Sequence, residues 1–377
     1  VVVSQASAWR FLERAHGMDE RLMSARLRAA CGLPATDAAA RVASWLGVAR
    51  GSFAPVMGVS LDDASVGALS VVGSTTPRDP LRMTSAEALA LGAEFGGGSW
   101  LGCYGEPRLV YTDRAFFKGA HGNSDRRTVH LGVDVFMPAG TPVHAPLEGV
   151  VEAVEHRDRH LDYGGMVVLR HQTPAGDQFA TLYGHLSRDT VAALAVGQRI
   201  SRGERVASLG TADENGGWAP HLHFQLTLLS EGLGADWPGV ADPDEFSMWR
   251  AVCPNPAALL NLPDAKTEHR PLDVAAISTG RRNHFAANLK LSYRNPCLFL
   301  RGWKHYLFDE WGRPYLDAYN NVPHVGHAHP RLQSIAGDQL SRLNSNTRYL
   351  HPAQVEFAET LQAKMPPHLT HVILVKS

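Results

Sequence analysis

Long apolar runs are missing from this sequence. None approaches the roughly 20 residues that a membrane-spanning helix requires, so we expect no membrane span. Cysteine is also scarce, and the four that occur are far apart and form no Cys-x-x-Cys pair: Cys31, Cys103, Cys253 and Cys297. This spacing favours free thiols in a reducing compartment over a disulfide framework, which predicts a cytoplasmic location.

An excess of one charge is absent as well. The 36 basic and 37 acidic residues give a net charge of -1, so nothing indicates a nucleic acid or an anionic membrane as a partner. The sequence begins at Val1, without the charged and apolar regions of a signal peptide, and ends in an apolar stretch at 372–375 that we expect to be a strand. We therefore interpret the chain as an internal fragment of a longer protein.

Histidine, in contrast, is abundant, with 19 in the chain. Segment 127–134 contains His130 and Asp134, and the later segment 220–224 contains His221 and His223. Residues two apart in a strand point to the same face, so the two later histidines can share one pocket. A hydrolytic zinc needs three protein ligands and one open position for water, and His130, Asp134 and one of these histidines would suffice.

A third segment, 182–187, supplies His185. It is strand-like and apolar and is bounded by glycine, as the other two segments are bounded by glycine or proline, and this shared context favours a metal site. We interpret His156, His160 and His171 as ordinary polar residues without a role in that site.

Residues 121–260 resemble the lysostaphin/LytM-type zinc metallopeptidases, whose signatures are His-x-x-x-Asp, Tyr-x-His-Leu and His-Leu-His-Phe. The connecting segments 138–151 and 196–204 match as well. The resemblance implies a mainly antiparallel β-sandwich that hydrolyses a peptide or peptidoglycan-like substrate. It also implies zinc ligands and a catalytic histidine pair, which are His130, Asp134 and His223 for the metal and His185 and His221 for catalysis. This chain has Gln225 where the family commonly has Glu.

The chemistry of such a centre is hydrolysis by a zinc-activated water. A neutral imidazole, His221 or His185, would accept the water proton and return it to the leaving amine, and the other would stabilise the developing charge. The sequence does not decide which histidine has which role. A purely structural zinc is disfavoured, because structural sites are closed by four ligands. A lipoyl-type binding domain is excluded for this segment, since no lysine lies between Lys118 and Lys266.

Residues 282–377 resemble the N-terminal part of a class III pyridoxal-phosphate aminotransferase, and the most similar branch contains ethanolamine-phosphate phospho-lyase and the alanine–glyoxylate-like enzymes. The resemblance is carried by segments 306–312, 315–317, 320–330 and 343–351. By this resemblance Ser377 would be the first residue of the cofactor phosphate cup, and the Schiff-base lysine would lie beyond the chain. Pyridoxal phosphate, a small amine or amino acid substrate and a homodimer are therefore expected only in the full-length parent.

The sequence as a whole predicts a multidomain chain. The expected parts are a helical tail of a preceding domain (1–51), a mixed α/β connecting region (52–120), the zinc peptidase-like β domain (121–260), a linker (261–281) and a truncated α/β aminotransferase entry segment (282–377). Within the connecting region, we expect residues 102–111 to form a turn and then a strand, with no functional site. The predicted function is zinc-dependent amide hydrolysis. The alternative is a parent aminotransferase or phospho-lyase in which the peptidase-like domain is auxiliary.

Overall fold

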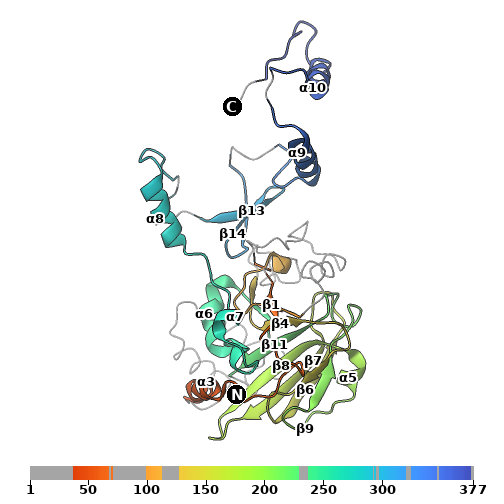
Figure 1. Ribbon diagram of the computed structural model, residues 1–377, viewed down its shortest axis with the longest axis vertical. Coiled ribbons are helices and arrows are strands. Elements are labelled where there is room, and N and C mark those ends of the chain that lie inside the picture. The colour runs from red at the N-terminus through yellow and green to blue at the C-terminus, as the bar shows by residue number, and fades with distance from the viewer. Residues whose placement is uncertain are drawn as a thin grey trace, which may run out of the picture. The chain divides into compact units, whose positions relative to one another are not determined.

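The computed structural model describes residues 37–67, 69–70, 99–112, 127–228, 237–291, 293, 297–319, 324–345 and 348–374 (Figure 1). The chain divides into two compact units, residues 1–322 and 323–377. The helical lead expected over 1–51 is described only from residue 37, where α3 (Ala38–Ala49) buries Val42 and Leu46. Ser377, the expected cofactor residue, lies outside the described residues.

A large, mainly antiparallel sheet dominates the first unit, as the sequence predicted (Figure 1). Its strand order is β1-β2-β4-β11-β8-β7-β6-β9, and the pairing of β1 with β2 is parallel. Its eight strands are β1 (Ser65–Val66), β2 (Trp100–Gly102), β4 (Val133–Phe136), β6 (Gly149–Arg157), β7 (Gly164–Gln172), β8 (Gln178–Leu186), β9 (Arg199–Ile200) and β11 (His221–Thr227).

The central strands bury both faces because the sheet separates two hydrophobic clusters. In β7, Val167 and Leu169 belong to one cluster, whereas Met166 and Val168 belong to the other. The alternation of side chains along a strand sends consecutive residues to opposite faces. β11 is buried at all seven positions, so its polar residues need partners inside the protein.

Three smaller sheets complete the first unit. β5 (Pro142–His144) pairs with β10 (Arg205–Ser208), and β3 (Val129–His130) pairs with β12 (Val240–Ala241). The third small sheet consists of β13 (Phe299–Trp303), β14 (Tyr306–Asp309) and β15 (Pro314–Leu316). Trp303 and Phe308 of this sheet pack in one hydrophobic cluster with Leu109.

Short helices follow and flank the sheets. Residues 256–262 pack into the main core through Leu259 and Leu262. The expected linker contains α7 (Asp264–Thr267) and most of α8 (Val274–His284). The remaining helices of the first unit are η1 (Leu109–Thr112), α5 (Arg188–Ala192), η3 (Pro243–Glu245), α6 (Phe246–Val252), η4 (Pro256–Ala258), α7 (Asp264–Thr267) and α8 (Val274–His284). The strand expected to end the 102–111 segment is wrong, because η1 occupies its end.

The second unit contains α9 (Pro330–Arg342) and α10 (Pro352–Gln362), neither of which buries a residue. The strand expected over 372–375 is not formed in its described part, 372–374. A strand satisfies its backbone groups by pairing, and no strand of the described residues pairs with this segment.

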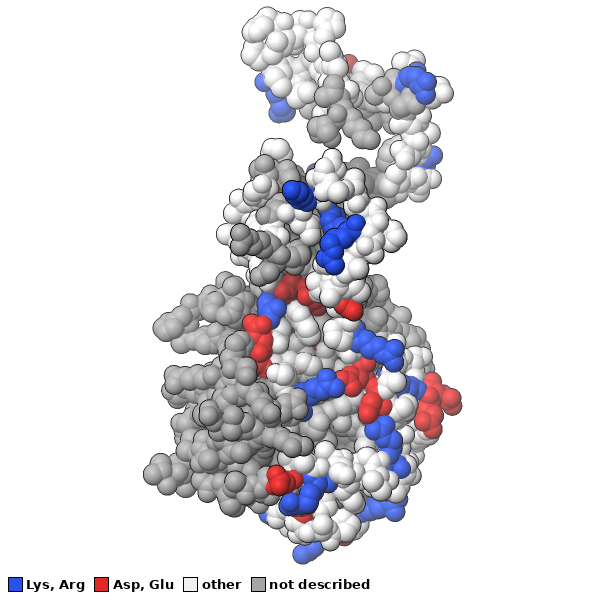
Figure 2. All heavy atoms as spheres, turned by 90° about the vertical axis from the view of Figure 1, so that its left-hand side faces the viewer, with Lys and Arg blue, Asp and Glu red and all other residues white. Residues whose placement is uncertain are grey.

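The charged side chains and the cysteines of the described residues agree with what the sequence predicts, which is a mixture of both charges and free thiols. Figure 2 shows acidic and basic side chains interspersed on the displayed face of the first unit. Three cysteines lie in the described part of the chain, and all three are free thiols: Cys103, Cys253 and Cys297. Of the helices that are described, none has the length and apolar character to cross a membrane.

Candidate metal centre

Strand register brings the predicted site residues together. The β4–β11 pairing places His223 opposite Asp134, and the β11–β8 pairing places His223 opposite Gly184, next to His185. β3 precedes β4 across a short turn and carries His130. Residues far apart in the sequence therefore meet because their strands are neighbours in the sheets.

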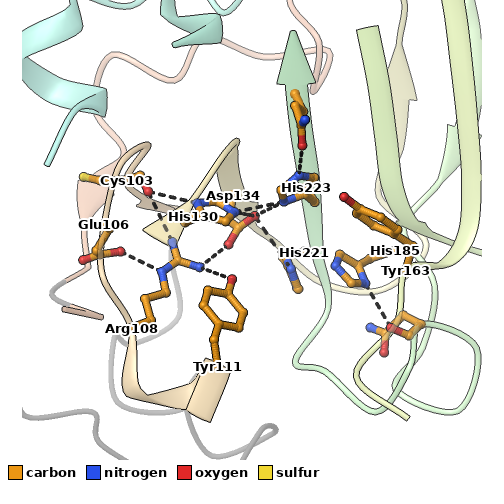
Figure 3. A network of polar contacts seen from close by, with 12 residues as sticks. Cys103, Glu106, Arg108, Tyr111, His130, Asp134, Tyr163, His185, His221 and His223 are labelled. Atoms are coloured by element: carbon orange, nitrogen blue, oxygen red, sulfur yellow. Dashed lines mark hydrogen bonds and ion pairs between the residues drawn. The ribbon is translucent and has the colours of Figure 1, made fainter. Parts of the chain in front are cut away.

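His130, Asp134 and His223 converge on one point (Figure 3). Oδ1 of Asp134 lies 3.1 Å from Nε2 of His130 and 3.1 Å from Nδ1 of His223. These two imidazole nitrogens are 2.9 Å apart, and one ligand atom from each residue fits within 4.8 Å. All three side chains are buried, and the described residues contain no other such group.

The tautomers of His130 and His223 follow from the hydrogen-bond partner of the second nitrogen in each ring. Nδ1 of His130 lies 2.9 Å from the Cys103 carbonyl oxygen, which can only accept, so this nitrogen carries the proton. Nε2 of His223 donates to Oε1 of Gln225 at 3.0 Å, because the Gln225 amide nitrogen itself donates to the Pro238 carbonyl. The nitrogens that face each other therefore both carry lone pairs.

Three acceptors, two nitrogens and a carboxylate oxygen, thus meet with no proton between them. Burial and the Arg108 charge lower the pKa of His130 to about 4, which keeps its ring neutral at neutral pH. Burial alone would raise the pKa of the Asp134 carboxyl, but the charge of the Arg108 guanidinium helps to hold it well below its usual range. A cation fits this arrangement, and nitrogen and carboxylate donors in a set of three suit zinc.

His185 and His221 lie beside this group, and within the described part of the chain their Nε2 atoms make no hydrogen bond. Nδ1 of His185 donates to the Asn215 carbonyl at 2.9 Å, and Nδ1 of His221 donates to the Ala219 carbonyl at 2.6 Å. The two rings are 4.2 Å apart, and Nε2 of His221 is 3.9 Å from Oδ1 of Asp134. Burial lowers the pKa of both histidines, well below the usual range for His185. Both are therefore neutral and able to accept a proton.

The backbone at His185 is unusual. Its φ angle is +65°, a left-handed conformation that costs free energy in a non-glycine residue and is concentrated at functional sites. The backbone N–H of His185 donates to the Tyr163 carbonyl and helps to hold this conformation. The result is an imidazole that faces the cavity from the end of β8.

A cavity of about 420 Å³ opens over the site. His185, His221 and His223 contribute to its wall together with aromatic side chains, which are Tyr111, Tyr163, Trp218 and Trp237. A site with apolar walls and a few convergent polar groups is typical of ligand-binding pockets. A substrate in this cavity can contact the group of His130, Asp134 and His223 and, at the same time, the imidazoles of His185 and His221.

The sequence interpretation missed part of the site. Segment 102–111, expected to contain no functional site, supplies the Cys103 carbonyl and also Arg108, whose Nη1 lies 2.6 Å from Oδ2 of Asp134. The signal was the oppositely charged pair Glu106 and Arg108, because charged side chains that become buried must be paired. Of the histidines interpreted as ordinary, His171 is buried and bonded to Glu148 and Thr181, whereas His160 lies at the cavity wall.

Two sequence details have a structural explanation. Gln225 stands where a Glu is common, and its amide oxygen accepts a hydrogen bond from Nε2 of His223. Gly132 lies between His130 and Asp134, and a Cβ added there would lie 2.7 Å from Cε1 of His223 and 2.8 Å from the Phe224 carbonyl oxygen. Only glycine leaves room for the His223 ring at this point.

Comparison with known proteins agrees with this geometry. Residues 128–233 match the model of Peptidase family M23, so the chain contains a LytM-like M23 domain. The chain is 39% identical over 108 residues to an uncharacterized metalloprotease of Haemophilus influenzae, covering 29% of this chain and 20% of that protein. It is 35% identical over 115 residues to the peptidoglycan DD-endopeptidase ShyA of Vibrio cholerae, covering 30% and 24%.

A relative of a different class matches another short segment. The chain is 41% identical over 98 residues to an alanine–glyoxylate aminotransferase 2-like protein of Drosophila melanogaster, covering 26% of this chain and 20% of that protein. This similarity confirms the class III aminotransferase resemblance. The chain spans only about a fifth to a quarter of the length of these curated relatives.

We expect Gly132→Ala to lower the free energy of unfolding of the metal-free protein by about 1–3 kcal/mol, because the added methyl overpacks the site. Urea denaturation measures the change. Gly47→Ala in α3 is the matched control, since nothing lies within 4 Å of its Cβ, and it should stabilise the helix by roughly 0.5–1 kcal/mol. Equal stability of the two variants would contradict the steric argument.

Proposed function

We propose that the M23 domain at residues 128–233 is a zinc-dependent metalloendopeptidase that cleaves an amide bond in a peptide or peptidoglycan-like substrate. The observation that carries the proposal is the convergence of three unprotonated acceptors beside two neutral histidines at one cavity. The similarity to the peptidoglycan DD-endopeptidase of Vibrio cholerae extends over 115 residues, about the length of this domain, and it supports the substrate class.

His130, Asp134 and His223 would hold the metal through Nε2, Oδ1 and Nδ1. Bound zinc lowers the pKa of a water ligand and polarises a carbonyl group. Three protein ligands leave a position for that water, as in catalytic rather than structural zinc sites. The Cys103 carbonyl and the Gln225 amide oxygen fix the rings of the two histidine ligands.

His185 and His221 would handle the protons. Each presents an unprotonated Nε2, because its Nδ1 proton is held by a backbone carbonyl. One imidazole accepts the proton of the attacking water at Nε2 and then donates it to the leaving amine. The other would stabilise the oxygen that becomes negative as the amide carbon turns tetrahedral; because its ring is neutral with the proton on Nδ1, it would donate from Nε2 only after taking up a proton from solvent. Both assignments of these roles remain open.

The purified chain should bind about one zinc ion per molecule, because the centre offers one set of three ligands. His130→Ala and Asp134→Ala should each abolish binding. Elemental analysis after dialysis measures the zinc content. His284→Ala, an exposed histidine on α8, is the control and should retain the metal. A chain without zinc, or zinc retained in both ligand variants, would refute the assignment.

His221→Ala should keep its zinc while hydrolysis falls by roughly 10²–10⁴-fold, the usual contribution of a general acid–base group. Glycine-rich peptides and peptidoglycan fragments are the first substrates, with cleavage followed by chromatography. Zinc content is measured on the same sample, so loss of metal and loss of proton transfer are distinguished. A zinc-loaded His221→Ala protein as active as the wild-type chain would rule out the role.

A second candidate function concerns the parent protein. We propose that it is a class III pyridoxal-phosphate aminotransferase or phospho-lyase, with the M23 domain auxiliary. The similarity to the Drosophila protein supports this proposal. The homodimer, the small amine or amino acid substrate and the cytoplasmic location expected from the sequence belong to the same proposal.

This chain alone should bind no lysine-linked pyridoxal phosphate, because the resemblance assigns the Schiff-base lysine to a part of the family that the sequence does not include. Titration with the cofactor, followed by visible absorbance and borohydride reduction, measures the linkage. An exposed lysine forms a weak linkage that dilution reverses, and this provides the baseline. A stable, stoichiometric linkage in the chain would contradict the prediction.

A further inference from the structure

We infer that Arg108 is a positioning residue of the metal centre: it holds Oδ2 of Asp134 so that the carboxylate offers only Oδ1 to the metal. The inference deepens the proposed zinc site and rests on it. It is carried by the contacts of a buried guanidinium that lies outside the matched M23 segment, 20 residues before residue 128.

Four groups fix the Arg108 side chain, and one of them is the Cys103 carbonyl oxygen, which accepts from Nη2 at 3.5 Å (Figure 3). Nε lies 2.8 Å from Oε2 of Glu106, and Nη1 lies 2.6 Å from Oδ2 of Asp134 and 3.1 Å from the Tyr111 hydroxyl. The other oxygen of Glu106 accepts the backbone N–H of Leu69 at 3.0 Å. Arg108, Glu106 and Asp134 are each no more than 3% exposed, so solvent screens these ion pairs little.

The two oxygens of Asp134 have separate partners. Oδ2 faces Arg108, whereas both ligand nitrogens of the histidines lie 3.1 Å from Oδ1. A free carboxylate can bind a cation through one oxygen or both. With Oδ2 held by a charge-assisted hydrogen bond, the carboxylate is restricted to one-oxygen binding, which keeps a coordination position open for water.

The same segment also positions the first histidine ligand. The Cys103 carbonyl accepts the Nδ1 proton of His130, and Gly102 pairs with Asp134 across β2 and β4. The backbone of His130 bonds to Glu106 and Gly105, and the Arg108 N–H donates to the Thr128 carbonyl. Segment 100–112 therefore orients two of the three ligands, and Arg108 is its charged contact with the centre.

The test compares zinc affinity in full-chain variants by competition with a chromophoric chelator. Arg108→Met should weaken zinc binding by roughly 10–100-fold, the usual effect of losing a group that orients a metal ligand. Because it leaves Glu106 unpaired, the double variant Arg108→Met/Glu106→Gln is made in parallel and should show the same loss. Arg108→Lys should be intermediate, since it keeps the charge and loses the planar fork.

Leu109→Ala is the matched control. This neighbour is buried in a hydrophobic cluster with Trp303 and Phe308, and Asp134 is not part of that cluster, so the variant should lose stability and keep wild-type zinc affinity. Cobalt(II) substitution adds a spectroscopic readout. Release of Oδ2 lets the carboxylate bind through both oxygens, and the visible absorption should weaken in the Arg108→Met proteins as the coordination number rises.

The outcomes separate this inference from the proposed function. A wild-type chain that binds no zinc would refute both. If the wild-type chain binds zinc and both Arg108→Met proteins bind it equally well, the positioning role is wrong while the zinc site stands. The role is also wrong if Leu109→Ala loses as much affinity as Arg108→Met, because general destabilisation would then explain the loss.

Discussion

Asp134 is a carboxylate buried in the centre of the sheet, and compensation of its charge is the constraint on which the rest of the site depends. An unpaired buried charge is costly, so its neighbours must supply positive charge or hydrogen-bond donors. Arg108 supplies one full charge at Oδ2. Oδ1 faces imidazole nitrogens that carry no proton toward it, and this leaves one side of the carboxylate for a cation.

The two sides of Asp134 face groups with different chemical properties. The side of Arg108, Glu106 and Tyr111 is a closed network of ion pairs and hydrogen bonds. The side of His185 and His221 is a cavity wall with free lone pairs. This division suits the metal-assisted hydrolysis proposed above, in which the first side would orient a ligand and the second would transfer protons.

Much of this arrangement could be predicted from the sequence, because the motifs are local. His-x-x-x-Asp and His-x-His fix their own spacing, and strand periodicity places both histidines of the latter on one face. The β13–β15 sheet was also predictable, since its strands are joined by short turns. The contact of Arg108 was not predictable, because its partner Asp134 lies 26 residues away on β4 and no local pattern encodes that contact. The strand predicted over 372–375 is not formed in its described part, although its residues favour β-structure. The reason is that a strand forms only when it pairs with a neighbouring strand.

The contact between His130 and His223 joins residues 93 positions apart, and this distance has a consequence during synthesis. At the roughly 5–20 residues per second of a ribosome, Asp134 emerges on the order of 5–20 s before the strand that completes the centre. Arg108 has already emerged by then, 26 residues ahead of the carboxylate that it binds. The nascent chain thus carries a counter-ion for Asp134 from the start, and His223 reaches the other oxygen of this carboxylate only when β11 joins the sheet.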